Sequence, residues 1–247
     1  GANISGSNGI HFGPDGLLYI ASVVGSDITV IDPDSGEEIK RYTAADGVFG
    51  PDDVAFASDG SFYWTSILTG EVAGFTPGGE RIVAAQLAPG SNPITFSNDD
   101  RLFVSHCFLG TNLYELDPSG VAEPRLIADD LGPGCGLNGM DWGPEERLYG
   151  PRWFANEVVS YDVDTGERRG EATGFATPAA SKFDSQGVLH VLDTATGELI
   201  RVEGDEKTVL VSLDPGLDNF AFDENDTPYI SSYTDGFIKR VNADGTI

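Results

Sequence analysis

The chain has 247 residues, with 40 acidic and 14 basic side chains and a formal net charge of −26. A surface this acidic repels phosphate groups, so we expect neither nucleic acid nor a membrane as a partner. No apolar stretch approaches the roughly 18 residues that span a bilayer, and two cysteines are too few for a disulfide scaffold.

The first unit of the chain is predicted to form four short strands. Apolar or alternating runs occupy 8–12, 17–22, 27–32 and 38–43, and a turn cluster lies at 32–37. Period-2 runs separated by Gly, Pro and Asp clusters are typical of antiparallel strands. No segment shows a helical period over a window of about 11 residues. The prediction is therefore an all-β fold.

A polar turn followed by an apolar, aromatic-bearing run recurs along the whole chain. The copies lie at 13–22, 57–66, 97–106, 143–152, 184–193 and 223–232. A period of about 40 residues is typical of a stacked supersecondary unit. Six four-stranded antiparallel units predict one domain, a six-bladed β-propeller over 1–247, with blades at roughly 7–47, 51–88, 91–130, 137–173, 178–213 and 217–247. A solenoid would need capping repeats, and none is visible.

The sixth unit lacks room for its fourth strand. In the internal units this strand ends shortly before the next first strand, but neither 246–247 nor the residues before 7 are long enough to supply it. Propellers close their ring by pairing the last blade, because an open edge is a liability. We therefore expect an incomplete last blade, which a missing segment or a second chain completes.

An Asn/Asp column at the entrances of the first strands is the main candidate site. It lies four positions before an aligned aromatic residue and comprises Asn8, Asp52, Asn92, Asn138 and Asp218, with Ala179 in the fifth blade. First-strand entrances ring the central channel, so these oxygens should converge. Asp53 and Asn219 occupy the next column. Oxygen ligands of mixed charge suit Ca²⁺ or another divalent cation; the alternative is that these residues merely start strands.

The ends of the second strands return to the same face and supply further candidates. We expect His106, Arg152 and Asp193 to line this mouth, although Asp193 could instead bond backbone at a strand end. His106 suits general-base work near neutral pH, and Arg152 could hold a substrate carboxylate. The apolar wall is predicted to comprise Trp153, Phe108 and Tyr233.

Cys107 and Cys135 fall in loops of adjacent blades at the same mouth. A disulfide between them and two separate thiols are both compatible with this placement. A disulfide would indicate an oxidising compartment, extracellular or periplasmic.

Three segments carry a resemblance to a known family: SNGIHF (7–12), LNGMDW (137–142) and LDNFAF (217–222), each followed by a hairpin of DG-LY type. They resemble the calcium-dependent six-bladed propellers of the senescence-marker/gluconolactonase/luciferin-regenerating group, with paraoxonases and diisopropyl-fluorophosphatase as distant relatives. The resemblance spans all six blades. It implies a catalytic Ca²⁺ on Asn8, Asn138 and the Asp218–Asn219 pair, with Asn92 and Asp52 as further ligands. No Glu stands in the ligand column, and Ala179 interrupts it.

The predicted function is a Ca²⁺-dependent hydrolase that acts on a lactone or related ester, a small-molecule substrate. The cation at the channel mouth would polarise the carbonyl. Asp218, Asp53, Asp52 or His106, with Asp193 as a further candidate, would activate water or attack directly. Two alternatives stay open: a non-catalytic NHL-like binding propeller, and a metal-free propeller lyase or condensing enzyme of the strictosidine-synthase type.

Overall fold

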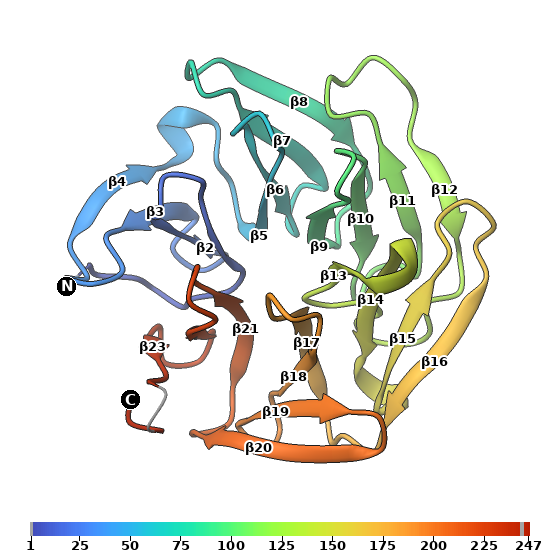
Figure 1. Ribbon diagram of the computed structural model, residues 1–247. Coiled ribbons are helices and arrows are strands. Elements are labelled where there is room, and N and C mark those ends of the chain that lie inside the picture. The colour runs from blue at the N-terminus through green and yellow to red at the C-terminus, as the bar shows by residue number, and fades with distance from the viewer. Residues whose placement is uncertain (1, 243–244) are drawn as a thin grey trace.

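Six antiparallel sheets surround a central channel in the computed structural model, which describes residues 2–242 and 245–247 (Figure 1). The described residues form twenty-three strands and three single-turn 3-10 helices at Ala44–Asp46, Pro144–Glu146 and Trp153–Ala155. In every blade the strands follow chain order from the channel outward. This arrangement confirms the all-β six-bladed propeller.

The first five blades each contain four strands. Their bounds are β1 (Ile10–Phe12), β2 (Leu18–Ser22), β3 (Asp27–Ile31) and β4 (Glu38–Tyr42); β5 (Pro51–Phe56), β6 (Phe62–Ser66), β7 (Glu71–Phe75) and β8 (Arg81–Gln86); β9 (Ser91–Phe96), β10 (Leu102–His106), β11 (Leu113–Leu116) and β12 (Arg125–Ala128); β13 (Asp141–Gly143), β14 (Arg147–Arg152), β15 (Glu157–Tyr161) and β16 (Arg168–Thr173); and β17 (Pro178–Phe183), β18 (Leu189–Asp193), β19 (Glu198–Glu203) and β20 (Glu206–Ser212).

The sixth blade has three strands within the described residues: β21 (Leu217–Phe222), β22 (Pro228–Ser232) and β23 (Ile238–Arg240). The expected incomplete last blade is therefore confirmed. Residues 243 and 244 of the expected range 217–247, and residue 1, lie outside the described residues. The N-terminal segment joins this blade, because the Ser7 amide donates to the Ser232 carbonyl at 3.0 Å.

Aromatic pairs between adjacent blades close the ring. The aromatic residue of each second strand packs on that of the next blade's first strand, with ring centroids 4.8–5.6 Å apart. The six pairs are Tyr19–Phe56, Tyr63–Phe96, Phe103–Trp142, Tyr149–Phe183, His190–Phe222 and Tyr229–Phe12. Five of these pairs are edge-to-face and Phe103–Trp142 is stacked, and such contacts add to the free energy gained by burial. Because the last pair joins the sixth blade to the first, the circle of contacts is complete.

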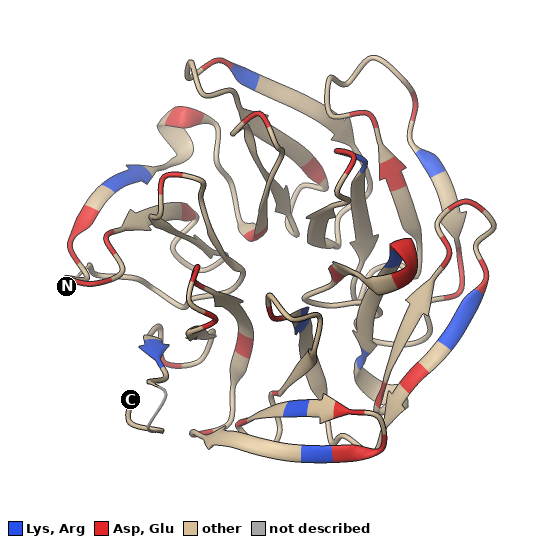
Figure 2. Ribbon diagram, viewed as in Figure 1, with Lys and Arg blue, Asp and Glu red and all other residues tan. Residues whose placement is uncertain are grey.

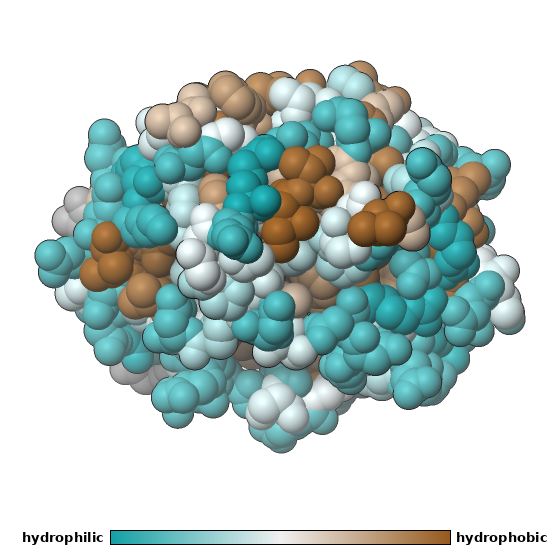
Figure 3. Space-filling view, turned by 90° about the horizontal axis from the view of Figure 1, so that it is seen from above, coloured by the Kyte–Doolittle hydropathy of each residue, from teal (hydrophilic) through white to brown (hydrophobic). Residues whose placement is uncertain are grey.

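Acidic residues are spread over all the blades (Figure 2). Arginines such as Arg41, Arg101 and Arg152 form ion pairs with some of them. The face drawn in Figure 3 is mostly hydrophilic, with small apolar patches. Among the helices of the described chain, none has the length and apolar character required to cross a bilayer.

Candidate functional site

The Asn/Asp column lies at one mouth of the channel and lines a single cavity of about 310 Å³. The polar part of its lining is Asn8, Asp52, Asn92, Asn138 and Asp218, and the apolar part includes Val23, Val24, Ile67, Phe108, Trp153 and Tyr233. We refer to the five polar residues as the ring. The ring residues other than Asn8 are less than 10% exposed. The structure thus brings together five predicted ligands and three predicted wall residues.

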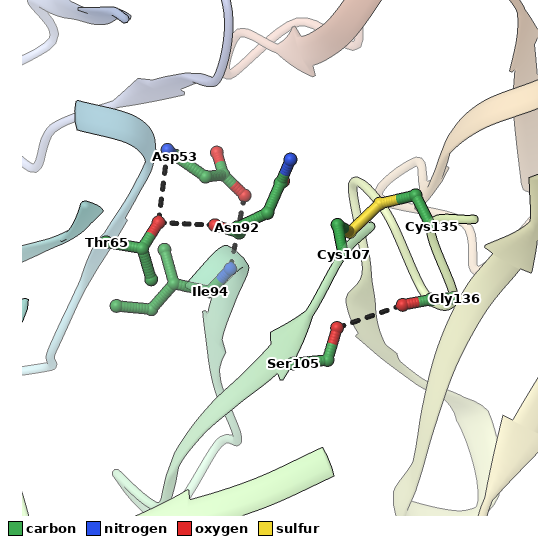
Figure 4. The surroundings of a disulfide bond; sticks show 8 residues. All are labelled: Asp53, Thr65, Asn92, Ile94, Ser105, Cys107, Cys135 and Gly136. Carbon is green, nitrogen blue, oxygen red and sulfur yellow. Dashed lines mark hydrogen bonds between the residues drawn. A yellow bond between two sulfur atoms is a disulfide. The ribbon is translucent and has the colours of Figure 1, made fainter. Parts of the chain in front are cut away.

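Hydroxyl groups on the second strands hold the backbone of the ring. Thr65 on β6 donates to the Asn92 carbonyl of the next blade, and its oxygen accepts from the Asp53 amide at 3.3 Å (Figure 4). Ser231 on β22 plays the same part, since it donates to the Asn8 carbonyl at 2.6 Å. The sequence analysis missed these residues. Their signal is a Ser or Thr two positions after the aromatic residue of the second strand.

The ring side chains differ in whether they already form hydrogen bonds with other protein groups. The Asn8 Oδ1 atom accepts from the Val23 amide at 3.1 Å, and the Asn8 side chain also forms a hydrogen bond with the Asp218 carboxylate. Asn8 therefore orients Asp218. By contrast, the side chains of Asp52, Asn92 and Asn138 have no hydrogen-bond partner anywhere in the described chain. Their oxygens are free to bind a ligand.

Two buried carboxylates meet in the ring without a protein cation. Burial, then the charges of Asp218 and Asp53, raise the pKa of Asp52 well above its usual range. Burial, then the charge of Asp53, also raises the pKa of Asp218, and the hydrogen bond from Asn8 opposes that shift. Within 2–242 and 245–247 neither carboxylate belongs to an ion pair. A bound cation would remove this mutual repulsion.

The chemistry of these donors fits a hard divalent cation. Two carboxylates and two free amide oxygens carry a charge of about −2 and favour Ca²⁺. The described residues contain no group of three or more His, Cys, Asp or Glu side chains arranged to hold a metal. The ring contributes only two such side chains, and amides supply the rest of its oxygens.

A second tier of buried side chains lies next to the ring and includes Asp53 and Asn219. The Asp53 carboxylate accepts from the amides of Val54 and Ile94, at 3.0 and 3.3 Å, and from Asn219 Nδ2 at 3.2 Å. Burial raises the pKa of Asp53 to about 6, and the charge of Lys182 works in the opposite direction. A β-carbon on Gly9 would lie 2.1 Å from Asp53 Oδ1, so only glycine fits there. Asn219 and Asp53, both predicted site residues, are thus engaged with each other.

The opposite half of the channel contains a separate cavity of about 200 Å³, lined by His11, Asp141 and Lys182 among aromatic side chains. Lys182 Nζ donates to the Met140 carbonyl at 2.9 Å, and Asp141 accepts from the Phe183 amide at 3.0 Å. Burial, then the charge of Lys182, lowers the pKa of His11 to about 4. This cavity shares no lining residue with the ring cavity.

The side chains in the column at the ends of the second strands form hydrogen bonds with loop backbone and do not line the ring cavity. Arg152 Nε donates to the Leu131 carbonyl at 3.0 Å, and Arg152 also pairs with Glu157 at 2.6 Å. The Asp193 carboxylate accepts from four backbone amides of its own blade, which are those of Ala176, Thr177, Ala195 and Thr196. The structure therefore places Arg152 and Asp193 outside the cavity lining, and Asp193 takes the alternative role of bonding backbone.

His106 also lies outside the cavity lining. It is 4% exposed and packs edge-to-face on Tyr114. Burial lowers the pKa of His106, and a hydrogen bond with the Ala88 backbone opposes the shift. Its Nε2 atom has no hydrogen-bond partner in the described chain.

Cys107 and Cys135 form a disulfide (Figure 4). The bond joins the loop after β10 to the loop before β13, and the Phe108 amide donates to the Gly134 carbonyl at 2.7 Å beside it. Phe108 packs on Trp153 with ring centroids 5.4 Å apart. The disulfide therefore supports one wall of the ring cavity, and it is consistent with an oxidising compartment.

Solved structures with this fold come from proteins of different activity. Virginiamycin B lyase from Staphylococcus aureus has a TM-score of 0.75 at 14% identity, over 99% of this chain and 85% of its own. A gluconolactonase from Xanthomonas campestris has a TM-score of 0.74 at 14% identity, over 94% of this chain and 84% of its own. A chain of a nidogen/laminin complex has a TM-score of 0.75 at 17% identity, over 92% and 89%.

The sequence itself matches no protein-family model and no curated protein. At identities of 14–17% the shared property is the fold. The resemblance to gluconolactonase-like propellers is confirmed at that level. The fold does not determine the reaction, which depends on the residues of the ring and its cavity.

Proposed function

We propose that this chain is a Ca²⁺-dependent hydrolase of a lactone or related ester, with its site in the ring cavity. The observation that carries the proposal is the pair of buried carboxylates, Asp52 and Asp218, which converge with free amide oxygens and lack a protein cation in the described chain. Burying such charges is costly unless they are paired or bind a metal.

Asp52, Asp218, Asn92 and Asn138 would hold the cation, while Asn8 keeps Asp218 in place. Bound Ca²⁺ supplies a Lewis acid that polarises a carbonyl oxygen. The apolar wall lowers the polarity beside the ring, and a less polar surrounding strengthens electrostatic interactions there.

The chain's own contribution to the reaction is proton transfer and positioning. A carboxylate oxygen of Asp218 or Asp52 would take the proton of the attacking water, because these are the carboxylates that line the cavity. Asp53 is held by three hydrogen bonds in the second tier. His106, Arg152 and Asp193 do not line the cavity and receive no step.

The test compares bound metal and hydrolysis in matched variants. Elemental mass spectrometry after gel filtration should find about one Ca²⁺ per wild-type chain and none in Asn138→Ala or Asp218→Asn. Asn225→Ala is the control, because Asn225 lies in the exposed turn after β21, at the opposite end of that strand from Asp218. Hydrolysis of γ-butyrolactone and phenyl acetate should stop in chelator and return with Ca²⁺.

Three outcomes would contradict the proposal. Stoichiometric Ca²⁺ in Asn138→Ala and Asp218→Asn would place the metal elsewhere. Full activity in chelator would indicate a metal-free enzyme. Bound Ca²⁺ without turnover of any lactone or ester would favour a non-catalytic binding propeller.

A further inference from the structure

A set of exposed apolar side chains surrounds the mouth of the ring cavity. Its members are 44–79% exposed, and each lies in the connection between the second and third strands of its blade. We call this set the apolar collar; it comprises Val24, Leu68, Phe108, Leu109, Phe154 and Tyr233. Single exposed apolar residues are common on proteins, but the same loop carries them here in five of the six blades.

The collar is continuous with the wall of the cavity. Val24, Phe108 and Tyr233 belong to both, so the apolar surface runs from the rim down to the ring. Trp153 connects Phe154 to this surface, because the Trp153 ring lies 5.4 Å from that of Phe108 and 6.3 Å from that of Phe154. A contiguous apolar surface that leads into a cavity with a few convergent polar groups is typical of a small-molecule site.

The fifth blade leaves an opening in the collar. Its equivalent loop is Thr194–Ala195–Thr196, and the Asp193 carboxylate fixes that loop through backbone amides. The same blade places Ala179 in the ring column, where the other blades have Asn or Asp. The site therefore has one small, more polar side, and apolar surface on the other blades.

We propose that the site takes an amphipathic substrate, an ester or lactone whose carbonyl end reaches the ring and whose alkyl or aromatic body lies on the apolar collar. This inference rests on the proposed function and names its substrate class. A polyhydroxylated sugar lactone fits less well, because its hydroxyl groups would lose water against Val23, Val24 and Ile67 without gaining hydrogen bonds. An alkyl body gains free energy there for each methylene removed from water.

The first experiment measures kcat/KM in Ca²⁺ for γ-butyrolactone, γ-octalactone, γ-dodecalactone and gluconolactone. We expect kcat/KM to rise by about two- to fourfold per added methylene until the collar is covered, and gluconolactone to be the poorest substrate. Val24→Ser and Leu68→Ser should flatten this rise. Val121→Ser and Leu126→Ser are matched controls that should not, because these residues are similarly exposed but lie around β12, outside the collar.

The second experiment measures binding without turnover. The probes are the non-hydrolysable ketones 2-pentanone and 2-undecanone. Their binding is measured by the quenching of tryptophan fluorescence. Ketone binding that tightens with chain length and weakens in Val24→Ser supports the collar as a ligand surface, even if no lactone is hydrolysed and the hydrolase proposal fails.

Two results would overturn the inference. Hydrolysis with no dependence on chain length would leave the proposed function standing and remove the amphipathic substrate class. Sedimentation of the protein with phosphatidylcholine vesicles, without ketone binding, would assign the collar to a lipid surface instead.

Discussion

Asp52 affects the stability of the folded protein in two opposite ways. Burial of its charge lowers stability, and binding of a cation to that charge would raise it. In chelator, we expect Asp52→Asn to raise the melting temperature at pH 7–8, by about 2–4 °C for each kcal/mol gained. In saturating Ca²⁺, the same variant should melt below the wild type, because ligand binding stabilises only the protein that binds it. Differential scanning calorimetry under both conditions measures the crossing.

The pH dependence of that difference has a definite sign. The folded-state pKa of Asp52 is raised, so the penalty of its ionised form is absent below the unfolded value of about 4 and grows as the pH rises through the folded value. The advantage of Asp52→Asn in chelator should therefore shrink from pH 8 towards pH 4. Asp205→Asn, at an exposed turn, is the matched control variant. An advantage that grows on acidification would contradict the assignment.

Alignment of the repeats located the ring, because residues in one column of a propeller occupy equivalent places around the channel. It could not show how each side chain is used. Asn219 donates to Asp53 from 166 positions away in sequence, and the orientation of Asn8 depends on Val23 and Asp218. At the ends of the second strands, the sequence did not distinguish side chains that face the channel from those, such as Arg152, that turn back to a loop.

Among the structural elements, strands were predictable because their periodicity and turn residues are local. The aromatic columns that defined the repeats also proved to be the contacts between blades, as in Tyr19–Phe56. The hydroxyl contacts made by Thr65 and Ser231 were missed, since Ser and Thr are common in strands for other reasons. The disulfide was left open, because pairing depends on the distance between two loops.

The Cys107–Cys135 bond closes a segment with a sequence separation of 28. Loop-closure entropy predicts that the double variant Cys107→Ala/Cys135→Ala loses about 3–4 kcal/mol of unfolding free energy. Since the bond supports the wall that contains Phe108 and precedes Asn138, Ca²⁺ affinity should fall as well. Denaturant unfolding and Ca²⁺ titration measure the two effects. Wild-type protein treated with a reductant should behave like the variant; unchanged stability in both would contradict the expectation.

Over the whole molecule, a net charge of −26 makes self-repulsion a large unfavourable contribution. We expect the melting temperature in chelator to rise with ionic strength, because the Debye length falls to about 3 Å at 1 M salt. Tetramethylammonium chloride separates screening from coordination, since its methyl groups keep the charged nitrogen from direct contact with the ring oxygens. Equal increases with tetramethylammonium and sodium chloride would indicate screening; an increase with sodium alone would contradict it.

The tier of Gly9, Asp53 and Asn219 lies between the two cavities of the channel. We therefore expect the ring cavity to open to solvent at one mouth only. The ring cavity and the cavity beside His11 and Lys182 have no lining residue in common, so we expect a ligand to enter and leave the ring cavity by the same mouth. Product release and substrate entry would then use the same opening. We expect the rate of product release through that opening to limit turnover.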